Sequence, residues 1–465
     1  MNSKKDLMGK TNYFLVLLFF LIFIVCTTIY YVAAEVSGAP REMVDAVVEE
    51  GADSNPLTYD VDIDETVVVY DPLFYAHDRF RDYICITEAI HDWDPYFDWS
   101  TNYPPFCLVI AFFFSLGGDW DGITLQTQLE ALDREANYPG MIAFVVIYLI
   151  SILAVVAAFS FSKKNHPLRS ILLTLGLTAL FICSTPSLFL IDRGNYLSFA
   201  IIATMLWALF ETIGKKDAAA VMLAFASALK IYPLFILAYY FFEWILDMIR
   251  EKSIKAREDL RKHIFLCCAT GLIVTILPIL TFKHSIIDNV RGFGGGLFSF
   301  GGGGHMPQYF TVGLTGLISY IAKDLEVPGM LIWFLVGASV ALICYILIYL
   351  RRDDIRFAEK ALVLVALMTW LTPNSYVYNA CYMFAPTLAL LFERRPEGEK
   401  VQKRYFAYIA ICALLFVPKA YVYRLATHQS NAIWMDNALM IAIFVIFIAT
   451  SAVALIRNRN SSSRN

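Results

Sequence analysis

The sequence predicts an all-α polytopic membrane protein, and two observations predict it: the composition and the recurring apolar runs. Of the 465 residues, 58% are hydrophobic and only 17% are charged, whereas a soluble chain carries roughly 25% charge. Apolar runs recur along the whole chain, and a run of adequate length crosses the roughly 30 Å hydrocarbon core as a helix. We expect about 12 transmembrane helices, within a range of about 10 to 14.

The predicted spans follow one another in order along the chain. Residues 13–34 come after three lysines and exceed the roughly 7 to 15 apolar residues of a signal-peptide core, so we expect a retained helix. Two shorter apolar runs, 105–117 and 308–323, are predicted to be re-entrant or interfacial segments. The other predicted spans are 141–161, 170–188, 195–213, 217–229, 232–248, 263–281, 329–350, 358–372, 376–392, 404–418 and 436–456.

Six basic clusters predict the orientation, because short cytoplasmic loops collect Lys and Arg. The clusters lie at 163–169, 215–216, 250–262, 351–356, 394–404 and 457–459. Placing all six inside gives a multi-pass plasma-membrane protein, which we take to be bacterial, with both termini cytoplasmic. The segment 35–103 then becomes a long acidic first extracytoplasmic loop. Residues 192–195, 419–436 and a glycine-rich flap at 282–308 also lie outside.

Charge, cysteine usage and the lack of repeats weaken several functional classes. The net charge is only −4, and no basic low-complexity tail is present, which argues against a nucleic-acid partner. The nine cysteines fall mostly within apolar runs and show no zinc spacing, so we expect neither a disulfide framework nor a metal–thiolate site. No internal or inverted repeat is obvious, which weakens a transporter interpretation.

The first outer loop contains two closely spaced carboxylates, Asp78 and Asp82. If this stretch is helical, they lie at i and i+4 on one face. Their repulsion, together with partial burial, would raise the pKa of one of them, as a general base working near neutral pH requires. The alternative is that both belong to a solvated acidic surface.

Two cations are candidates for phosphate binding. Lys230 interrupts an apolar run, which is costly enough in a membrane to suggest a function, and Pro233 would break the helix there. The alternative for Lys230 is a snorkelling side chain at a hairpin turn. Arg193 lies in a short outer turn and suits bidentate phosphate contact, or a local ion pair with Asp192.

The segment from Arg291 to His305 is rich in glycine and phenylalanine but does not match a phosphate-binding P-loop. The preceding strand, the following helix and the Lys-Ser/Thr ending that such a loop needs are all missing from the sequence pattern. We expect a mobile outer flap that lies on lipid and closes over a bound chain. Arg291 and His305 would then contact a donor phosphate or an acceptor, the alternative for His305 being a solvated loop histidine.

The order of several short motifs resembles one family of membrane enzymes. The motifs are Asp78, Tyr83, Asp94-Pro95-Tyr96, Tyr103-Pro104-Pro105, Arg193-Gly194-Asn195, Lys230-Ile231-Tyr232-Pro233 and the stretch 371–379. This order resembles the polytopic glycosyltransferases of the GT-C class, and within it the polyprenol-phosphate-mannose-dependent group, glycosyltransferase family 87. The chain departs from the family pattern at Asn195, where Gln is more usual.

The resemblance implies a GT-C-like fold in which 1–465 is a single transmembrane catalytic domain and the loop 35–103 carries the catalytic carboxylate. It implies inverting transfer of a sugar, mannose as the first expectation, from a polyprenyl-phosphate donor to a lipid or glycan acceptor on the outer membrane face. Asp78 would be the general base, with Asp82 positioning the acceptor or tuning the pKa of Asp78. The donor phosphate would meet Lys230, Arg193, His305 and Arg291, and the substrates would contact Tyr83, Tyr96, Tyr103 and Asn195.

No cofactor is expected, and the predicted partners are the sugar donor, the acceptor and membrane lipids. The alternative is a divalent metal held by His77, Asp78, Asp82 and His91, although a donor with one phosphate needs a metal less than a nucleotide-diphosphate sugar does. The rival function is a transporter, flippase or polymerase of lipid-linked saccharides. In a transporter, Asp78→Asn would leave substrate movement largely intact.

Overall fold

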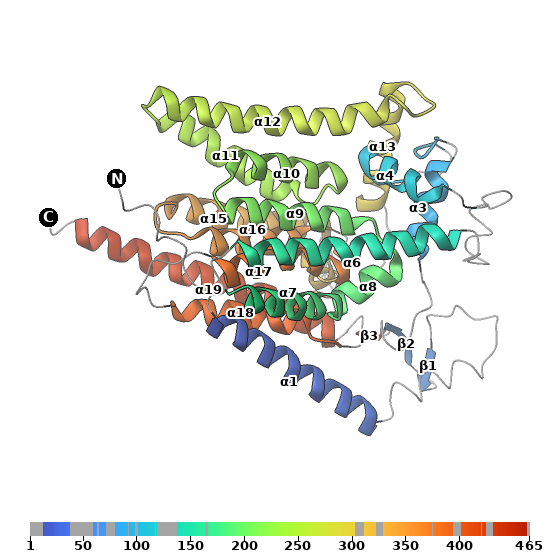
Figure 1. Ribbon diagram of the computed structural model, residues 1–465, viewed down its shortest axis with the longest axis horizontal. Coiled ribbons are helices and arrows are strands. Elements are labelled where there is room, and N and C mark those ends of the chain that lie inside the picture. Colours follow the sequence, from blue (N-terminus) through green and yellow to red (C-terminus); the bar gives the residue numbers. More distant parts are fainter. Residues whose placement is uncertain are drawn as a thin grey trace. The chain divides into compact units, whose positions relative to one another are not determined.

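The protein is mainly helical and carries one small three-stranded antiparallel sheet in the computed structural model (Figure 1). The prediction of a helical polytopic membrane protein is thus confirmed at this coarse level, whereas the sheet was not predicted. The chain divides into two compact units. The structure describes residues 13–37, 59–62, 65–70, 80–91, 93–97, 101–116, 118, 137–162, 166–302, 311–321, 329–373, 375–393, 401–419, 421–424 and 431–462.

Unit 1 comprises Met1–His77, Phe159–Pro186 and Pro307–Asn465. Residues 361 to 371 of α16 are all buried, as expected for a helical stretch that is apolar on nearly every side. The helices of unit 1 are α1 (Tyr13–Ser37), α7 (Pro167–Ile182), α14 (Leu314–Ile321), α15 (Gly329–Leu350), α16 (Phe357–Leu371), α17 (Phe384–Phe392), α18 (Lys403–Phe416) and α19 (Asn431–Ser462), with the 3-10 helix η3 (Val377–Met383).

The sheet of unit 1 joins two segments that are far apart in sequence. Strand β2 (Glu65–Tyr70) pairs antiparallel with β1 (Tyr59–Asp62) on one side and with β3 (Tyr421–Arg424) on the other. The β2 sequence Glu-Thr-Val-Val-Val-Tyr is rich in the β-branched residues that favour strands. Since backbone pairing requires direct contact, these two segments lie on the same side of the membrane, as the predicted orientation requires.

Unit 2 comprises Asp78–Ala158 and Ser187–Met306. Helix α10 contacts both α9 and α12, which lie on either side of it in Figure 1. The helices are α3 (Arg81–His91), α4 (Pro105–Ser115), α6 (Tyr138–Phe161), α8 (Thr185–Arg193), α9 (Leu197–Thr212), α10 (Lys216–Leu229), α11 (Leu234–Arg250), α12 (Ile254–Ile279) and α13 (Ile286–Gly302), of which α6 ends and α8 begins in unit 1.

Five described helices are long and apolar enough to cross a membrane, namely α1, α6, α12, α15 and α19, and a sixth span results if the bent pair α7 and α8 counts as one. The figure of about twelve spans therefore stays a prediction. Several predicted spans correspond to shorter helices, such as α9 with 16 residues and α10 with 14.

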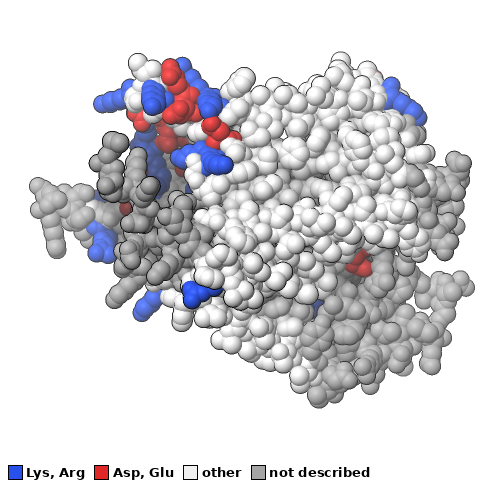
Figure 2. Space-filling model, viewed as in Figure 1, with Lys and Arg blue, Asp and Glu red and all other residues white. Residues whose placement is uncertain are grey.

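The surface of α12 fits a lipid-facing helix. Figure 2 shows acidic and basic atoms gathered over the connection between α11 and α12, a smaller basic patch near the other end of α12, and a charge-free band between them. Leu272 and Leu277 on this helix are 62% and 57% exposed. Large apolar side chains that face outward along a whole helix are expected where lipid covers them.

The segments predicted to be re-entrant or mobile contain short helices. The run 105–117 contains α4, with 11 residues, and the run 308–323 contains α14, with 8 residues. Within the predicted flap 282–308, residues 286–302 form α13, which the loop-like composition did not indicate. His305 lies outside the described residues.

Candidate active site

Asp82, in the first turn of α3, is the centre of a polar cluster in unit 2. Its Oδ1 accepts a hydrogen bond from Arg193 Nη2 at 2.6 Å, and its Oδ2 accepts one from Asn195 Nδ2, also at 2.6 Å. The side chains of Asp82 and Arg193 are only 18% and 22% exposed. Charge-assisted bonds of this kind are about twice as strong as neutral ones. Asp82 therefore holds Arg193 and Asn195 in fixed positions.

An unusual backbone conformation brings α3 onto the turn that carries Arg193. Phe80 has a φ of 59° and donates its N–H to the carbonyl of Asp192, and Gly194 has a φ of 60°. A Cβ at Gly194 would lie 2.6 Å from Tyr83 Cβ and 2.7 Å from Phe80 Cδ1. Only glycine satisfies both the left-handed backbone and this lack of space.

The same feature corrects one expectation about Asp78 and Asp82. Helix α3 begins at Arg81, and the left-handed φ of Phe80 interrupts helical backbone directly before it. The two aspartates therefore do not share one continuous helix at i and i+4. Asp78 itself lies outside the described residues, so its role as the base stays a prediction.

Asn195 serves two structural purposes at once. While its Nδ2 donates to Asp82, its Oδ1 accepts a hydrogen bond from the backbone N–H of Leu197 at 2.8 Å. Leu197 is the first residue of α9, where backbone N–H groups lack helical partners. The amide thus ties the carboxylate of α3 to the beginning of α9, and the longer side chain of Gln would have to follow a different path.

Lys230 forms the second part of the site, between α10 and α11. Helix α10 ends at Leu229, Lys230 is extended, and α11 begins after Pro233, as the sequence predicted. The Nζ of Lys230 lies 3.5 Å from the ring centre of Tyr103 and 5.7 Å from that of Tyr232. Aromatic ring faces attract a cation in this arrangement.

The ammonium group of Lys230 has an unusual electrostatic environment. Among the residues that the structure describes, no carboxylate forms an ion pair or hydrogen bond with it. Burial lowers the pKa of Lys230 from 10.5 to about 8, although the negative charge of Asp82 acts in the opposite direction. A cation in such surroundings is stabilised when an anion binds.

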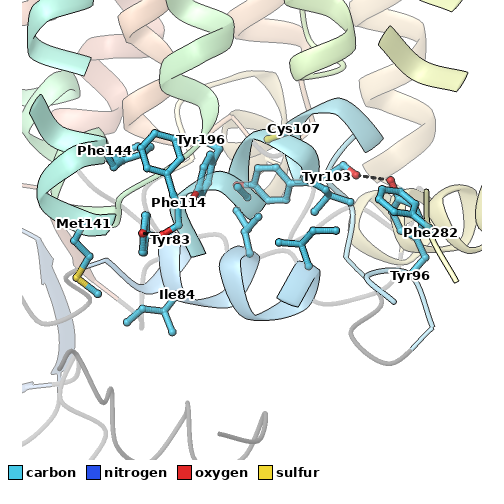
Figure 3. Packing of buried hydrophobic residues seen from close by; sticks show 14 residues of the cluster. Tyr83, Ile84, Tyr96, Tyr103, Cys107, Phe114, Met141, Phe144, Tyr196 and Phe282 are labelled. Carbon is cyan, nitrogen blue, oxygen red and sulfur yellow. Dashed lines mark hydrogen bonds between the residues drawn. The ribbon is translucent and has the colours of Figure 1, made fainter. Parts of the chain in front are cut away.

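The ring that faces Lys230 belongs to Tyr103, and Tyr96 holds Tyr103 in place. The hydroxyl of Tyr96 donates to the carbonyl of Tyr103 at 2.9 Å, a bond drawn as a dashed line in Figure 3. Pro104 and Pro105 then begin α4, where a proline is favoured because no N–H partner is needed. Tyr96 is 3% exposed and Tyr103 is 9% exposed. Of the two, Tyr103 is brought to the cluster and Tyr96 lies behind it.

The hydroxyl of Tyr83 and the side chain of Arg291 make their contacts outside this cluster. The hydroxyl of Tyr83 donates to the carbonyl of Phe114 and accepts from Asn137, and its ring stacks on Tyr196. Figure 3 shows Tyr83 packed with Tyr196 and Phe114. Arg291, on α13, has a side chain that is 79% exposed and lies 4.0 Å from Asp288. The structure therefore unites Asp82, Arg193, Asn195, Lys230 and Tyr103 from the predicted set.

Two residues of this region escaped the sequence analysis. Tyr232 contacts Lys230, and its position in the run Lys-Ile-Tyr-Pro was the signal that could have revealed it. Glu88 on α3 is 5% exposed, and neither of its carboxylate oxygens has a hydrogen-bond partner in the described part of the chain. Burial raises the pKa of Glu88 to about 7. No pattern in the sequence singled out Glu88 among the acidic residues.

A divalent-metal site was the alternative considered for the polar residues of the first outer loop. Within the ranges that the structure describes, no three His, Cys, Asp or Glu side chains lie close enough together to hold a metal ion. Of the four residues considered as metal ligands, Asp82 accepts hydrogen bonds from Arg193 and Asn195. His77 and Asp78 lie outside the described ranges. The expectation that no cofactor is needed stays a prediction.

Comparison with models of known protein families gives a match. The family model described as glycosyltransferase family 87 matches residues 101–373, which is more than half of the chain. The matched region contains Tyr103, Arg193, Asn195 and Lys230, and it begins after Asp82. No curated protein matches the chain at a significant level.

Proposed function

This chain belongs to glycosyltransferase family 87, and on that premise we propose that it moves a sugar from a polyprenyl-phosphate donor to a lipid or glycan acceptor. Membership of the family indicates a glycosyltransferase in the membrane. The donor, the sugar, for which mannose is the first expectation, and the acceptor are the proposal. We place the reaction on the extracytoplasmic face of a plasma membrane and expect no cofactor.

The observation that supports a phosphate-containing donor is the environment of the Lys230 ammonium group. Its ammonium group faces the rings of Tyr103 and Tyr232, while no described carboxylate pairs with it. A partly buried cation that no described carboxylate pairs with is costly, and a bound anion removes the cost. A polyprenyl-phosphate sugar supplies such an anion at the membrane surface. The donor phosphate is therefore the natural occupant beside Lys230.

The proposed reaction breaks the bond between the anomeric carbon and the phosphate oxygen. The acceptor hydroxyl attacks that carbon from the opposite side, which inverts its configuration, and Asp78 takes the hydroxyl proton as general base. The electron pair of the broken bond stays on the phosphate, which leaves as polyprenyl phosphate with one more negative charge. Lys230 stabilises this charge as it develops, so it favours the transition state over the bound donor.

Arg193, Asn195 and Asp82 complete the proposed site. Because Asp82 is bonded to both Arg193 and Asn195, it would orient the guanidinium toward the phosphate rather than accept a proton itself. Arginine suits this role because its planar group contacts two oxygens at once. Tyr103 would keep Lys230 in place through its ring. His305, Arg291, Tyr83 and Tyr96 remain proposed contacts of the substrates.

The proposal is tested by incubating purified protein with a panel of short-chain polyprenyl-phosphate hexoses and pentoses and a lipid extract as acceptor. The expected result is release of polyprenyl phosphate from at least one donor by wild type, and at least a ~100-fold slower release by Asp78→Asn. Asn at this position keeps the size of the side chain but not its basicity. Silence from every donor, in protein that still binds such lipids, would favour a transporter or polymerase instead.

A further inference from the structure

Helix α13 carries an apolar stripe that no described part of the protein covers. Ile286, Ile287 and Val290 are 43%, 64% and 49% exposed. At 100° per residue these three positions lie within about 100° of one another around the helix. Asp288 lies about 160° away from Val290 by the same count, so polar and apolar residues occupy different faces.

Other positions of α13 are fixed to unit 2 by specific contacts. Asn289 is 1% exposed and donates to the carbonyl of His284. A Cβ at Gly292 would lie 2.8 Å from Tyr96 Cβ, and the ring of Phe293 packs on that of Tyr96 at 5.6 Å. The exposed stripe therefore cannot be turned inward without breaking this packing.

The start of α13 is anchored to the first outer loop as well. The N–H of Lys283 donates to the carbonyl of Trp93, and His284 Nε2 lies 2.9 Å from Asp94 Oδ2. Ser285 accepts a hydrogen bond from the N–H of Asp288, which satisfies one backbone donor of the first helical turn. These contacts set the direction in which α13 leaves the end of α12.

The exposed stripe continues the lipid-facing surface of α12. Leu277 and Leu280, in the last turn of α12 and directly after it, are 57% and 56% exposed, and Ile286 follows six residues later. In Figure 1, α12 runs along the long axis of the view, whereas α13 runs across it. A helix that crosses the end of a membrane span, with one apolar face, has the features of an interfacial helix.

We propose that α13 is an interfacial helix that rests on the bilayer surface where α12 ends, with Ile286, Ile287 and Val290 inserted among the lipid acyl chains. Arg291, whose side chain is 79% exposed, lies beside the stripe and would contact lipid phosphates. The partner is thus the lipid monolayer itself. This inference does not depend on which sugar donor the enzyme uses.

Glycine content explains why such a surface is needed. Six of the 17 residues of α13 are glycine, and each lowers helix stability relative to alanine. A helix of this composition does not persist without a surface that holds it. Unit 2 covers one face through Gly292 and Phe293, and the lipid would cover another.

The test places the photoreactive residue p-benzoylphenylalanine at Val290 or at Asp288 in full-length protein in nanodiscs of phosphatidylethanolamine and phosphatidylglycerol. Val290 is 49% exposed and the side chain of Asp288 is 48% exposed, so the two positions differ in face and not in exposure. After illumination, intact-protein mass spectrometry should find phospholipid adducts about fivefold more abundant at Val290, and close to the level at Leu277 in α12. Equal adducts at Val290 and Asp288 would overturn the proposal.

A second measurement on wild-type protein covers the case in which these variants fail to fold. Hydroxyl-radical footprinting in the same nanodiscs compares Ile287 with Ile254, which is 75% exposed and lies among the charged residues at the start of α12. Ile287 should be oxidised several-fold less than Ile254 if lipid covers it. Oxidation of both to the same extent would show that α13 faces water.

Discussion

Lys230 and Arg193 are both cations of the candidate site, but they differ in what binds them. Asp82 accepts a hydrogen bond from Arg193, whereas Lys230 faces the ring of Tyr103. The charge of Arg193 is thus partly compensated by a bonded carboxylate, whereas no carboxylate in the described part of the chain is bonded to Lys230. We infer that Lys230 gains more from a bound phosphate than Arg193 does.

The lowered pKa of Lys230 predicts a pH dependence. Only the protonated amine attracts the donor phosphate, and its pKa in the free protein is about 8. The value of kcat/KM should therefore fall as the pH rises through about 8. In Lys230→Arg the side chain keeps its charge to a pH of about 12, so this fall should disappear from the range 7 to ~10. A fall that persists unchanged in Lys230→Arg would assign it to another group.

Alanine substitutions at Gly194 and at Gly214 can be compared as a matched pair. Both have a positive φ, of 60° and 79°, but a Cβ meets Tyr83 and Phe80 at Gly194 and nothing within 4 Å at Gly214. Gly214→Ala should cost only the backbone strain, about 1 kcal/mol. Gly194→Ala should lower the melting temperature further and reduce turnover, because α3 and Asp82 must shift. Equal losses of stability and activity in the two variants would contradict this account of the turn.

Sequence indicated several residues that the structure brings together. Asp82, Arg193 and Asn195 were candidates because of their residue type and motif order, and the structure brings them together. What the sequence could not supply is the left-handed Phe80, since an aromatic residue ordinarily avoids that conformation and no local pattern signals it. Only the docking of α3 on the 192–195 turn explains it.

At the scale of single elements, glycine-rich segments were the hardest to predict. Glycine lowers helix propensity, so the run 291–302 looked like a loop, whereas the structure has α13 there. Tertiary contacts outweigh propensity here, because Gly292 lets the helix approach Tyr96 closely. The strand β2 was missed although its β-branched residues favour strands and β1 is close in sequence; only its pairing with β3, more than 350 residues away, had no local signal.

The glycines of α13 also make a testable prediction. A Cβ at Gly294 or Gly295 would meet nothing within 4 Å, whereas one at Gly292 would clash with Tyr96. Gly294→Ala combined with Gly295→Ala should stabilise the helix by about 1 to 2 kcal/mol and slow its amide hydrogen exchange in proportion. Gly292→Ala should instead speed exchange across residues 286–297. The reverse order of these two effects would show that α13 is not packed on Tyr96.

At the scale of the whole molecule, contacts between segments that are distant in sequence indicate which segments share a side of the membrane. Pairing of β2 with β3 fixes two segments of unit 1 to one side. In unit 2, Lys283 bonds to Trp93, which joins the start of the predicted flap to the first outer loop. Both contacts link segments that the basic clusters independently assign to the extracytoplasmic side. Many described helices are shorter than 18 residues, so that five of them, or six spans with the bent pair, are long and apolar enough to cross a membrane.

This topology can be tested by labelling single introduced cysteines with a membrane-impermeant maleimide in sealed vesicles of known orientation. Cysteines at Thr66 in β2 and Val422 in β3 should be labelled from the same side. A cysteine at Lys252, in the basic connection between α11 and α12, should be labelled only from the opposite side. Labelling of the protein without an introduced cysteine gives the contribution of its native cysteines. Labelling of Thr66 and Lys252 from one side would require a different topology.

The most direct test of the central claim is the affinity of the protein for short-chain polyprenyl phosphate, the product that the proposed reaction releases. We expect Lys230→Met to raise its Kd about 10- to 100-fold, the loss of one hydrogen bond to a charged group. Lys230→Arg should bind more tightly than Lys230→Met, because it keeps the charge. An unchanged Kd in a well-folded Lys230→Met protein would contradict the assignment of Lys230 as the ligand of the donor phosphate.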